Sequence, residues 1–349
     1  MVATVLTALA VSAAVPAVAQ APNPVSVKPL VAPAVPAKRP VKQDGAANAT
    51  SKSAASQKQR TALMSPVKTW AIQLQNLSTA SPLPPVDMFV ADATAGGPNG
   101  GPLSADDVAR LKSRPGGKRR IAISYLSIGE SEDYRPDYFT SEYMSEDAPD
   151  WLLKENQQWK GNRLIRFCEE GWQRTVLGDD DGHSVYNSVE WSPLYKLIDL
   201  GFDGVYLDRV DVYGEVQKEC PGAAEKMVAF VARLAAHARK KKPDFIVILQ
   251  NAEELLRDPK MIAAIDAVAK EDLFYGADHS ERANPESMVS TILENLAFAK
   301  RANRPVFVLD YLKDPSRRET DRAKIEAHGF IPYIGPRKLD QLWPQGAQF

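Results

Sequence analysis

The chain has 349 residues, 44% of them hydrophobic and 25% charged, so it is long enough to bury a sizeable core in one large domain. Its formal net charge is −1, and a basic stretch near the amino terminus leaves the remainder acidic, which argues against a nucleic-acid partner. Two cysteines and four histidines without paired ligand spacing argue against a zinc site.

The amino-terminal residues are typical of an export signal followed by a linker. Residues 1–20 are small and apolar and end in Ala17-Val18-Ala19, which fits a secretory cleavage site, although no Lys or Arg precedes the apolar run. Residues 21–63 are rich in Pro, Ala, Ser, Lys and Gln, which predicts a disordered linker. We expect an exported protein, periplasmic or extracellular, with no stable membrane insertion after signal removal. An uncleaved amino-terminal anchor is the alternative.

From residue 64 onward, apolar runs alternate with helical patterns, which predicts a parallel α/β architecture. Helices are expected from residue 104, with Ser104 as the cap, and near residues 171–176, 192–200, 223–242, 285–300 and 316–327. Candidate strands lie at residues 70–75, 88–92, 121–126, 164–167, 205–207, 245–249, 266–269, 306–311 and 330–334. The expected fold is a (β/α)8 TIM barrel over residues 64–349, in which one of the nine candidate strands is extra. Residues 151–159 are expected to form a loop.

Most of these strands are followed by an acidic residue. In a barrel, the carboxyl ends of the strands surround one mouth, so these acids are expected to lie close together. A ring of carboxylates suits glycoside hydrolysis, which needs one protonated and one ionised carboxyl, or a site for a hard metal ion. Aromatic side chains near the same strand ends favour a sugar, because flat rings stack on pyranose faces, although such rings also pack in cores. The acids are Asp92, Glu130, Asp208, Glu253, Glu271 and Asp310.

Several ordered motifs from about Lys68 to the carboxyl terminus resemble glycoside hydrolase family 114, the endo-α-1,4-polygalactosaminidase-like barrels. The resemblance implies a (β/α)8 barrel acting on an α-linked, galactosamine-containing exopolysaccharide. It places the family's catalytic aspartate on Asp208 and its catalytic glutamate on Glu271. The motifs are Tyr125-Leu126-Ser127-Ile128-Gly129-Glu130, Trp151-Leu152, Gly204-Val205-Tyr206-Leu207-Asp208, Leu249-Gln250-Asn251 and Ala269-Lys270-Glu271.

The residues themselves favour the same pair. Asp208 ends the most apolar strand, so it is the better nucleophile or stabilising carboxylate, and Glu271 is then the general acid/base. Glu253 competes for the second role because it also follows a strand. Other residues are expected to contact the substrate, with helix capping or an ion pair to Arg135 or Arg209 as the alternative for Glu130, Asp211 and Asp310. These substrate contacts are Asp92, Tyr125, Glu130, Tyr206, Asp211, Asn251, Glu253, Asp310 and Tyr311.

The sequence therefore predicts an exported, endo-acting glycoside hydrolase of an amino-sugar-rich polysaccharide, with no cofactor and no metal. Two alternatives remain open: a non-catalytic barrel that binds such a polysaccharide in envelope or matrix assembly, and a metal-dependent barrel enzyme. The spacing of Cys168 and Cys220 does not decide whether they form a disulfide.

Overall fold

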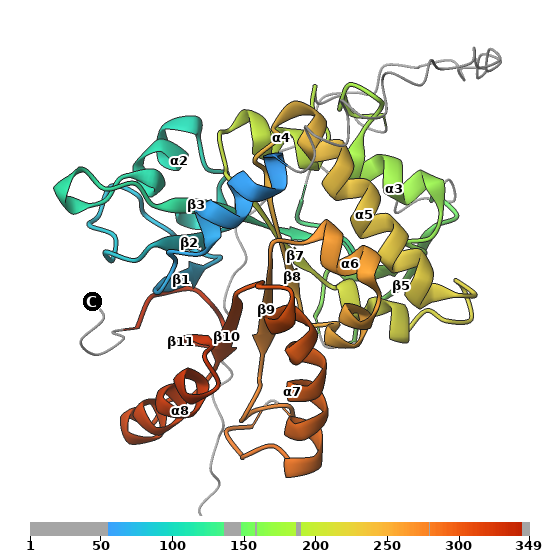
Figure 1. The fold of residues 1–349 in the computed structure, drawn as a ribbon. Helices are drawn as coiled ribbons and strands as arrows, with labels where there is room; N and C mark the ends of the chain where they lie inside the picture. Colours follow the sequence, from blue (N-terminus) through green and yellow to red (C-terminus); the bar gives the residue numbers. More distant parts are fainter. Residues whose placement is uncertain (1–54, 136–147, 158, 186–189, 279, 344–349) are drawn as a thin grey trace, which may run out of the picture. The chain divides into compact units, whose positions relative to one another are not determined.

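A computed structural model describes residues 55–135, 148–157, 159–185, 190–278 and 280–343, and the fold is reported for these residues. One parallel sheet contains eight strands in the order β1-β2-β3-β7-β8-β9-β10-β11. Helices surround this sheet (Figure 1). The strands are β1 Trp70–Gln73, β2 Met88–Ala91, β3 Ile121–Ser127, β7 Gly204–Asp208, β8 Ile246–Gln250, β9 Ala267–Glu271, β10 Val306–Asp310 and β11 Ile331–Ile334.

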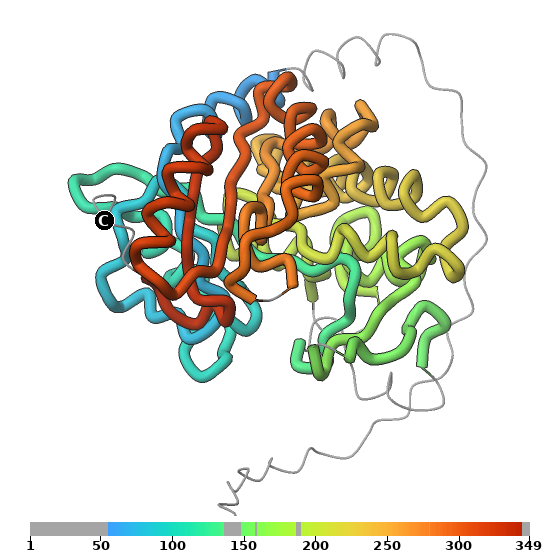
Figure 2. Tube along the Cα trace, turned by 90° about the horizontal axis from the view of Figure 1, so that it is seen from below, coloured from blue at the N-terminus to red at the C-terminus, as the bar shows by residue number. Residues whose placement is uncertain are grey.

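The two edges of the sheet meet, which makes it a (β/α)8 barrel. The indole nitrogen of Trp70 on β1 donates a hydrogen bond to the carbonyl of Ile331 on β11, at 3.1 Å. The backbone nitrogen of Leu74 donates to the carbonyl of Leu339, at 2.8 Å. Figures 1 and 2 both place the red carboxyl-terminal segment beside the blue first strand. The predicted TIM barrel is therefore confirmed.

The strands form because they are apolar along their whole length. Residues of β2, β8 and β10 are buried at every position, as expected for parallel strands covered on both faces. Inside the barrel, the ring of Trp70 lies 5.4 Å from Phe307, 5.7 Å from Tyr333 and 6.5 Å from Tyr206, measured between centroids. This aromatic layer fills the barrel below the residues that end the strands.

The helices begin and end close to where the sequence predicts. Ser104 caps the first of the labelled helices in a capping box with Asp107, as expected. In α5, the apolar side chains of Met227, Val231 and Leu234 are buried, so the helix packs one face on the barrel. The helices are α2 Ala105–Lys112, α3 Glu170–Leu177, α4 Pro193–Asp199, α5 Ala223–Lys241, α6 Pro259–Ala264, α7 Glu286–Arg301 and α8 Pro315–Ala327.

The extra candidate strand belongs to a second, smaller sheet. Residues 164–167 were expected in the barrel, but they overlap β6 (Asn162–Ile165), which pairs antiparallel with β4 (Glu130–Glu132) and β5 (Leu152–Glu155). The prediction of a loop over residues 151–159 is wrong where β5 forms. The sequence does not predict β5 because this strand is only partly buried and mixes apolar with charged residues, so it lacks a clear strand pattern. This side sheet lies between β3 and β7 in the chain and forms one wall of the cleft described below.

The last residues of the predicted linker are folded. Residues 55–64 form a helix, drawn in blue in Figure 1, so the linker prediction is wrong over residues 55–63. Arg60, which is 4% exposed, donates to Asp266 at 2.9 Å, just before β9 begins, and to the carbonyl of Pro243 at 3.1 Å. These contacts place the helix at the base of the barrel, where strands start. Residues 1–54, with the predicted signal and most of the linker, lie outside the described residues.

Cys168 and Cys220 form a disulfide, with 6.0 Å between their Cα atoms. The bond ties the segment after β6 to the segment that follows β7. In the part of the chain that the structure describes, no helix is both long enough and apolar enough to cross a membrane.

Candidate active site

The carboxyl ends of the barrel strands open into a cleft of about 1110 Å³. Its walls come from the ends of β1, β3, β7, β8, β9 and β10, from the side sheet and from the segment after β11. Nearly all of the residues predicted for the site line it, which the strand-end rule for barrels explains. Those residues are Asp92, Tyr125, Glu130, Tyr206, Asp208, Asp211, Asn251, Glu253, Glu271 and Tyr311.

Asp208 is the last residue of β7 and is half-buried in the cleft. Its Oδ2 accepts a hydrogen bond from the hydroxyl of Tyr125, at 2.6 Å, and its Oδ1 accepts one from the backbone nitrogen of Arg209, at 2.7 Å. Burial raises the pKa of Asp208 above its ordinary value, and these two hydrogen bonds act in the opposite direction. Asp208 thus has two donors that stabilise its ionised form.

Glu271 is the last residue of β9 and faces the same cleft. The hydroxyl of Tyr311 donates to its Oε1, and the side-chain amide of Gln250 donates to its Oε2. Burial and, next, the negative charge of Asp208 raise the pKa of Glu271 to about 7, while both hydrogen bonds oppose the rise. At neutral pH this carboxyl is therefore protonated in a large fraction of molecules, unlike an ordinary glutamate.

The register of the strands brings the two carboxyls together. Leu207 pairs with Leu249 on β8, and Leu249 pairs with Val268 on β9, so Asp208 is level with the residue two positions before Glu271. With one strand between them, their backbones are on the order of 10 Å apart, a gap that both side chains enter. Tyr206 lies at the floor of this gap. Both carboxylates raise the pKa of its hydroxyl, after burial as the main cause.

Three consecutive barrel strands end in residues with left-handed backbone. Arg209 (φ 57°) follows Asp208, Asn251 and Ala252 (both φ 52°) follow β8, and Asp272 (φ 51°) follows Glu271. Such conformations cost free energy for residues other than glycine and gather at functional sites. Here each one turns the chain directly after a strand that delivers a residue to the cleft.

Gly129 explains why one sequence motif needs a glycine. A Cβ at this position would collide with the backbone carbonyl of Arg209. The neighbouring Ile128 nitrogen donates to the carbonyl of Asp208, at 3.1 Å. The segment after β3 therefore packs directly on the backbone that carries Asp208.

Glu253, the competitor of Glu271, is 4% exposed and lies 3.4 Å from the ammonium group of Lys270. Burial raises its pKa, and the charge of Lys270 lowers it. The negative charge of Asp208 raises the pKa of Glu271, whereas the charges that act on Glu253 are those of Lys270 and Glu254. The arrangement favours Glu271 as the partner of Asp208.

Two of the acids expected to contact substrate are held by arginines. Asp92 accepts two hydrogen bonds from Arg135, at 2.8 and 2.5 Å. Glu130 is 3.0 Å from Arg209 and also accepts from the amide of Asn162 at 2.9 Å. These carboxylates line the cleft, and their oxygens are already engaged in supporting its walls.

Asp310 does not lie in the cleft, so its prediction as a substrate contact is wrong. It is fully buried and accepts hydrogen bonds from the backbone nitrogens of Leu273 and Phe274, at 2.8 and 3.4 Å. Its carboxyl faces Asp321 on α8, and burial followed by the charge of Asp321 raises its pKa. The cause is strand alternation: the next residue, Tyr311, points into the cleft, and Asp310 points outward to the helix layer.

Residues that were not predicted as site residues complete the site. Gln250 donates a hydrogen bond to Glu271, and Glu132, on β4 of the side sheet, pairs with Arg135. Arg337, from the segment after β11, donates to both oxygens of Asp272, at 3.0 and 2.7 Å. The position of Gln250 at the end of an apolar run could have identified it, whereas the pairing of Arg337 with Asp272 joins segments far apart in sequence and left no local signal.

The rim of the cleft carries exposed apolar side chains. Within the described ranges, the large hydrophobic side chains that are exposed are Tyr134 (52%), Trp159 (54%) and Met288 (43%), and all three line the cleft. Exposed apolar surface of this kind marks binding sites, and its position here indicates a ligand that extends beyond the carboxyl pair.

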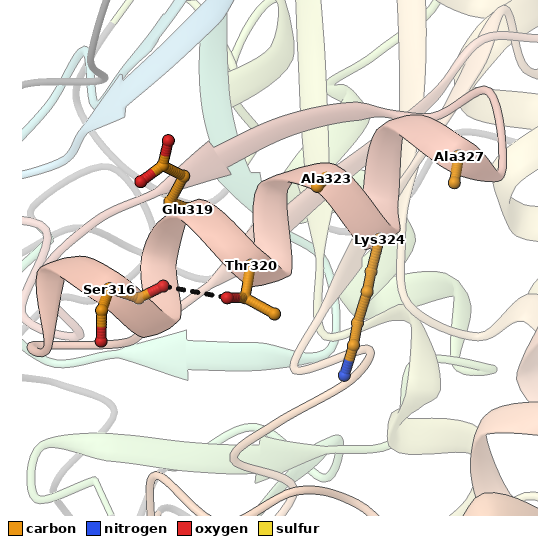
Figure 3. Close-up of a pocket in the computed structure, with 6 residues that line it drawn as sticks. All are labelled: Ser316, Glu319, Thr320, Ala323, Lys324 and Ala327. Atoms are coloured by element: carbon orange, nitrogen blue, oxygen red, sulfur yellow. Dashed lines mark hydrogen bonds between the residues drawn. The ribbon is translucent and has the colours of Figure 1, made fainter.

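A second depression, of about 740 Å³, lies on one face of α8 (Figure 3). A single helix supplies its whole lining, so it does not enclose a ligand, and we assign it no role. Its residues are Ser316, Glu319, Thr320, Ala323, Lys324 and Ala327. Among the described residues, no group of three or more histidine, cysteine, aspartate or glutamate side chains is arranged to hold a metal ion.

A (β/α)8 barrel whose mouth holds a carboxylate beside a carboxyl with a pKa near neutrality is the arrangement of a barrel glycosidase. The comparisons with known proteins agree. The chain belongs to glycoside-hydrolase family GH114, whose family model matches residues 49–347, and the resemblance seen in the motifs is confirmed.

The relatives and similar structures extend over most of the chain. An uncharacterised protein from Deinococcus radiodurans is 33% identical over 283 residues, covering 80% of this chain and 83% of the relative. One from Methanocaldococcus jannaschii is 30% identical over 294 residues, covering 78% and 77%. The glycoside hydrolase domain of PelA from Pseudomonas aeruginosa shares the fold, with a TM-score of 0.59 at 22% identity, covering 79% of this chain and 97% of that domain.

Proposed function

We propose that this glycoside hydrolase cleaves an α-linked, galactosamine-containing polysaccharide at internal bonds, with Asp208 and Glu271 as its catalytic pair. The observation that carries the proposal is the coupled pair itself: two carboxyls in one cleft, each held by a tyrosine hydroxyl, with the pKa of Glu271 raised to about 7 by burial and by the charge of Asp208. The substrate class follows from the GH114 family resemblance.

The two residues have different roles because their surroundings differ. Glu271 is protonated in a large fraction of molecules at neutral pH, and in that form it donates its proton to the leaving glycosidic oxygen. Asp208, with hydrogen bonds from Tyr125 and the Arg209 nitrogen, is the ionised partner that attacks or stabilises the developing positive charge at the anomeric carbon. Once Glu271 has lost its proton, it is the base that activates the next water. The negative charge of Asp208 thus raises the pKa of Glu271 and keeps a proton available for transfer.

Asp211 is the acid best placed to contact a sugar ammonium group. Its side chain is 43% exposed, and its nearest cation, Arg209, is 3.7 Å away. Asp92 and Glu130, by contrast, are buried and already bonded to arginines. A charge-assisted hydrogen bond from an amino sugar to Asp211 would favour deacetylated galactosamine over its acetylated form.

An exposed aromatic ring in the lining of the cleft suits a polymeric sugar substrate. Trp159 lies in the turn between β5 and β6, and its exposed ring gives a sugar unit a flat surface on which to stack. We expect Trp159→Ala to reduce cleavage of long chains by about tenfold, while leaving short oligomers unaffected. Equal losses on both substrates, measured by product release, would contradict this role.

We propose that the protein works outside the cytoplasm. The Cys168–Cys220 disulfide is a bond that forms and persists in oxidising compartments, and it fits the signal-like residues 1–20. Fractionation of the producing cells, followed by detection of the protein with a probe against the barrel, tests the location.

The experiment for the catalytic pair compares product release from a partly deacetylated galactosaminogalactan. The parent protein is assayed beside Asp208→Asn and Glu271→Gln, with Asp244→Asn and Glu294→Gln as matched substitutions on the outer surface. We expect the first two to lose at least a thousandfold in rate and the controls to keep full activity. Near-UV circular dichroism verifies that each variant is folded.

Two outcomes would overturn the assignment. If Glu253→Gln abolishes product release and Glu271→Gln does not, the acid/base is Glu253. If the parent releases no product from this polymer but cleaves another polysaccharide, the substrate class is wrong while the catalytic pair stands.

A further inference from the structure

The hydrogen bond that Glu271 accepts from Tyr311 is supported from behind by an arginine. The guanidinium carbon of Arg337 lies 4.2 Å from the centroid of the Tyr311 ring. Both of its terminal nitrogens donate to Asp272, the residue that directly follows Glu271. Glu271, Tyr311, Arg337 and Asp272 therefore form a closed ring of contacts, which is completed by the peptide bond between Glu271 and Asp272.

Asp208 has an equivalent support on the other side of the cleft. Arg135 lies 5.3 Å from the centroid of the Tyr125 ring, and the hydroxyl of Tyr125 donates to Asp208. Arg135 is itself held at two points by Asp92. The same order of groups, aspartate, arginine, tyrosine and catalytic carboxyl, therefore occurs twice, built from different strands.

The two arginines differ in how firmly they are embedded. The side chain of Arg135 is 6% exposed and pairs with Glu132 as well as with Asp92, so removing it would leave two buried carboxylates without their cation. The side chain of Arg337 is 29% exposed, lines the cleft and pairs with Asp272. Arg337 can therefore be replaced with less risk to the fold.

We propose that Arg337 is a positioning residue for hydrolysis, which acts through Tyr311 to hold the carboxyl of Glu271 in place against the glycosidic bond. The inference rests on the proposed function, in which Glu271 is the general acid. Arg337 comes from the segment after β11, beyond the last barrel strand, so this segment has a part in catalysis that its distance in sequence from Glu271 hides.

The physical basis is the attraction of a cation to the face of an aromatic ring. That attraction fixes the plane of the Tyr311 ring, and the positive charge makes its hydroxyl a stronger donor. A stronger hydrogen bond to the ionised carboxylate opposes the increase in the pKa of Glu271 caused by burial. The groups that face Glu271 are Asp208 and Tyr206 on β7, Gln250 at the end of β8, Asn251 after β8, Tyr311 after β10, its neighbour Asp272, and Arg337.

The test measures kcat and kcat/KM between pH 5 and 9 for Arg337→Gln and Arg337→Lys. Because Arg337→Gln removes both the charge and the ring contact, we expect kcat to fall about tenfold. The alkaline limb of the pH profile, where kcat/KM falls as Glu271 loses its proton, should move to a pH higher by about half a unit or more. Lysine keeps the charge but not the paired hydrogen bonds, so the alkaline limb of Arg337→Lys should lie between those of the parent and Arg337→Gln. Arg301→Gln is the matched control, since Arg301 lies 4.3 Å from the Phe298 ring on α7, outside the cleft.

A double substitution shows whether the effect passes through the tyrosine. If it does, Arg337→Gln combined with Tyr311→Phe has the same alkaline limb as Tyr311→Phe alone. Additive shifts would refute the route through Tyr311. Lower activity at every pH with no movement of the limb, in variants that remain folded by circular dichroism, would mean that Arg337 only supports the fold.

Failure of this inference can be told apart from failure of the proposed function. If Glu271→Gln stays active and keeps the alkaline limb, Glu271 is not the acid and the proposed function fails. If Glu271→Gln is inactive while Arg337→Gln keeps the parent's limb and rate, the proposed function stands and the role of Arg337 is refuted.

Discussion

Removing the disulfide should destabilise the barrel measurably without abolishing activity. The bond between Cys168 and Cys220 closes a loop with a sequence separation of 52 residues. In the chain-entropy model, a loop of this length limits the unfolded ensemble by about 4 kcal/mol at 25 °C. For a folded part of roughly 300 residues, with an unfolding entropy of about 2.1 cal/mol/K per residue, this corresponds to a melting temperature about 6 °C lower.

The assay compares the parent with the double variant Cys168→Ala, Cys220→Ala by calorimetry and by urea unfolding, each with and without reductant. We expect reduced parent and double variant to have the same melting temperature, and reductant to leave the double variant unchanged. Activity at 25 °C should persist, because Asp208 is positioned by its strand and by Tyr125 and not by the disulfide.

An unchanged melting temperature in the double variant would refute the loop-closure reasoning. A loss of activity at 25 °C in a variant that is still folded would show that the bridge also orders the cleft, contrary to the assignment of its position to β7 and Tyr125.

Three further results are expected. The value of kcat/KM should fall as pH rises above about 7, because the raised pKa of Glu271 keeps the acid protonated up to that pH and not beyond; a plateau to pH 9 would contradict this. Asp321, which faces another buried carboxyl, has a pKa raised to about 6, so its contribution to stability is complete below pH 4 and is lost as pH rises through 6. Asp321→Asn should therefore raise the urea midpoint relative to the parent at pH 8 and not at pH 4, and an equal change at both would disprove the linkage. Gly129→Ala should cost about 2 kcal/mol or more in unfolding free energy, because its Cβ meets the Arg209 carbonyl, whereas Gly214→Ala, with open space around it, should cost less than half of that in the same unfolding assay.

The barrel could be predicted because its strands are buried on both faces. Continuous apolar runs such as residues 245–249 are visible without any long-range information, and so are the acids that follow them. The side sheet could not be found in this way, because β4 and β5 are short and polar and are stable only against β6. The helix over residues 55–64 has the composition of a linker, and its contacts are with residues far along the chain: Arg60 pairs with Asp266, and Met64 is buried in the core.

The candidate site was predictable in its members and less so in their contacts. Strand ends identified Asp208 and Glu271, but the rule does not say which of two adjacent residues faces the barrel axis. At β10 both Asp310 and Tyr311 were expected in the cleft, and only Tyr311 lines it. The register of the strand determines which of the two residues faces the barrel axis. Register depends on pairing between strands, which no local sequence pattern contains.

The helix over residues 55–64 also determines from which side the barrel can be held. It contacts Pro243 and Asp266, which precede β8 and β9, so the chain enters the folded part at the closed end, opposite the cleft. A tag or linker joined to the barrel at residue 55 therefore starts at the amino-terminal ends of the strands, a full barrel height away from the carboxyl pair.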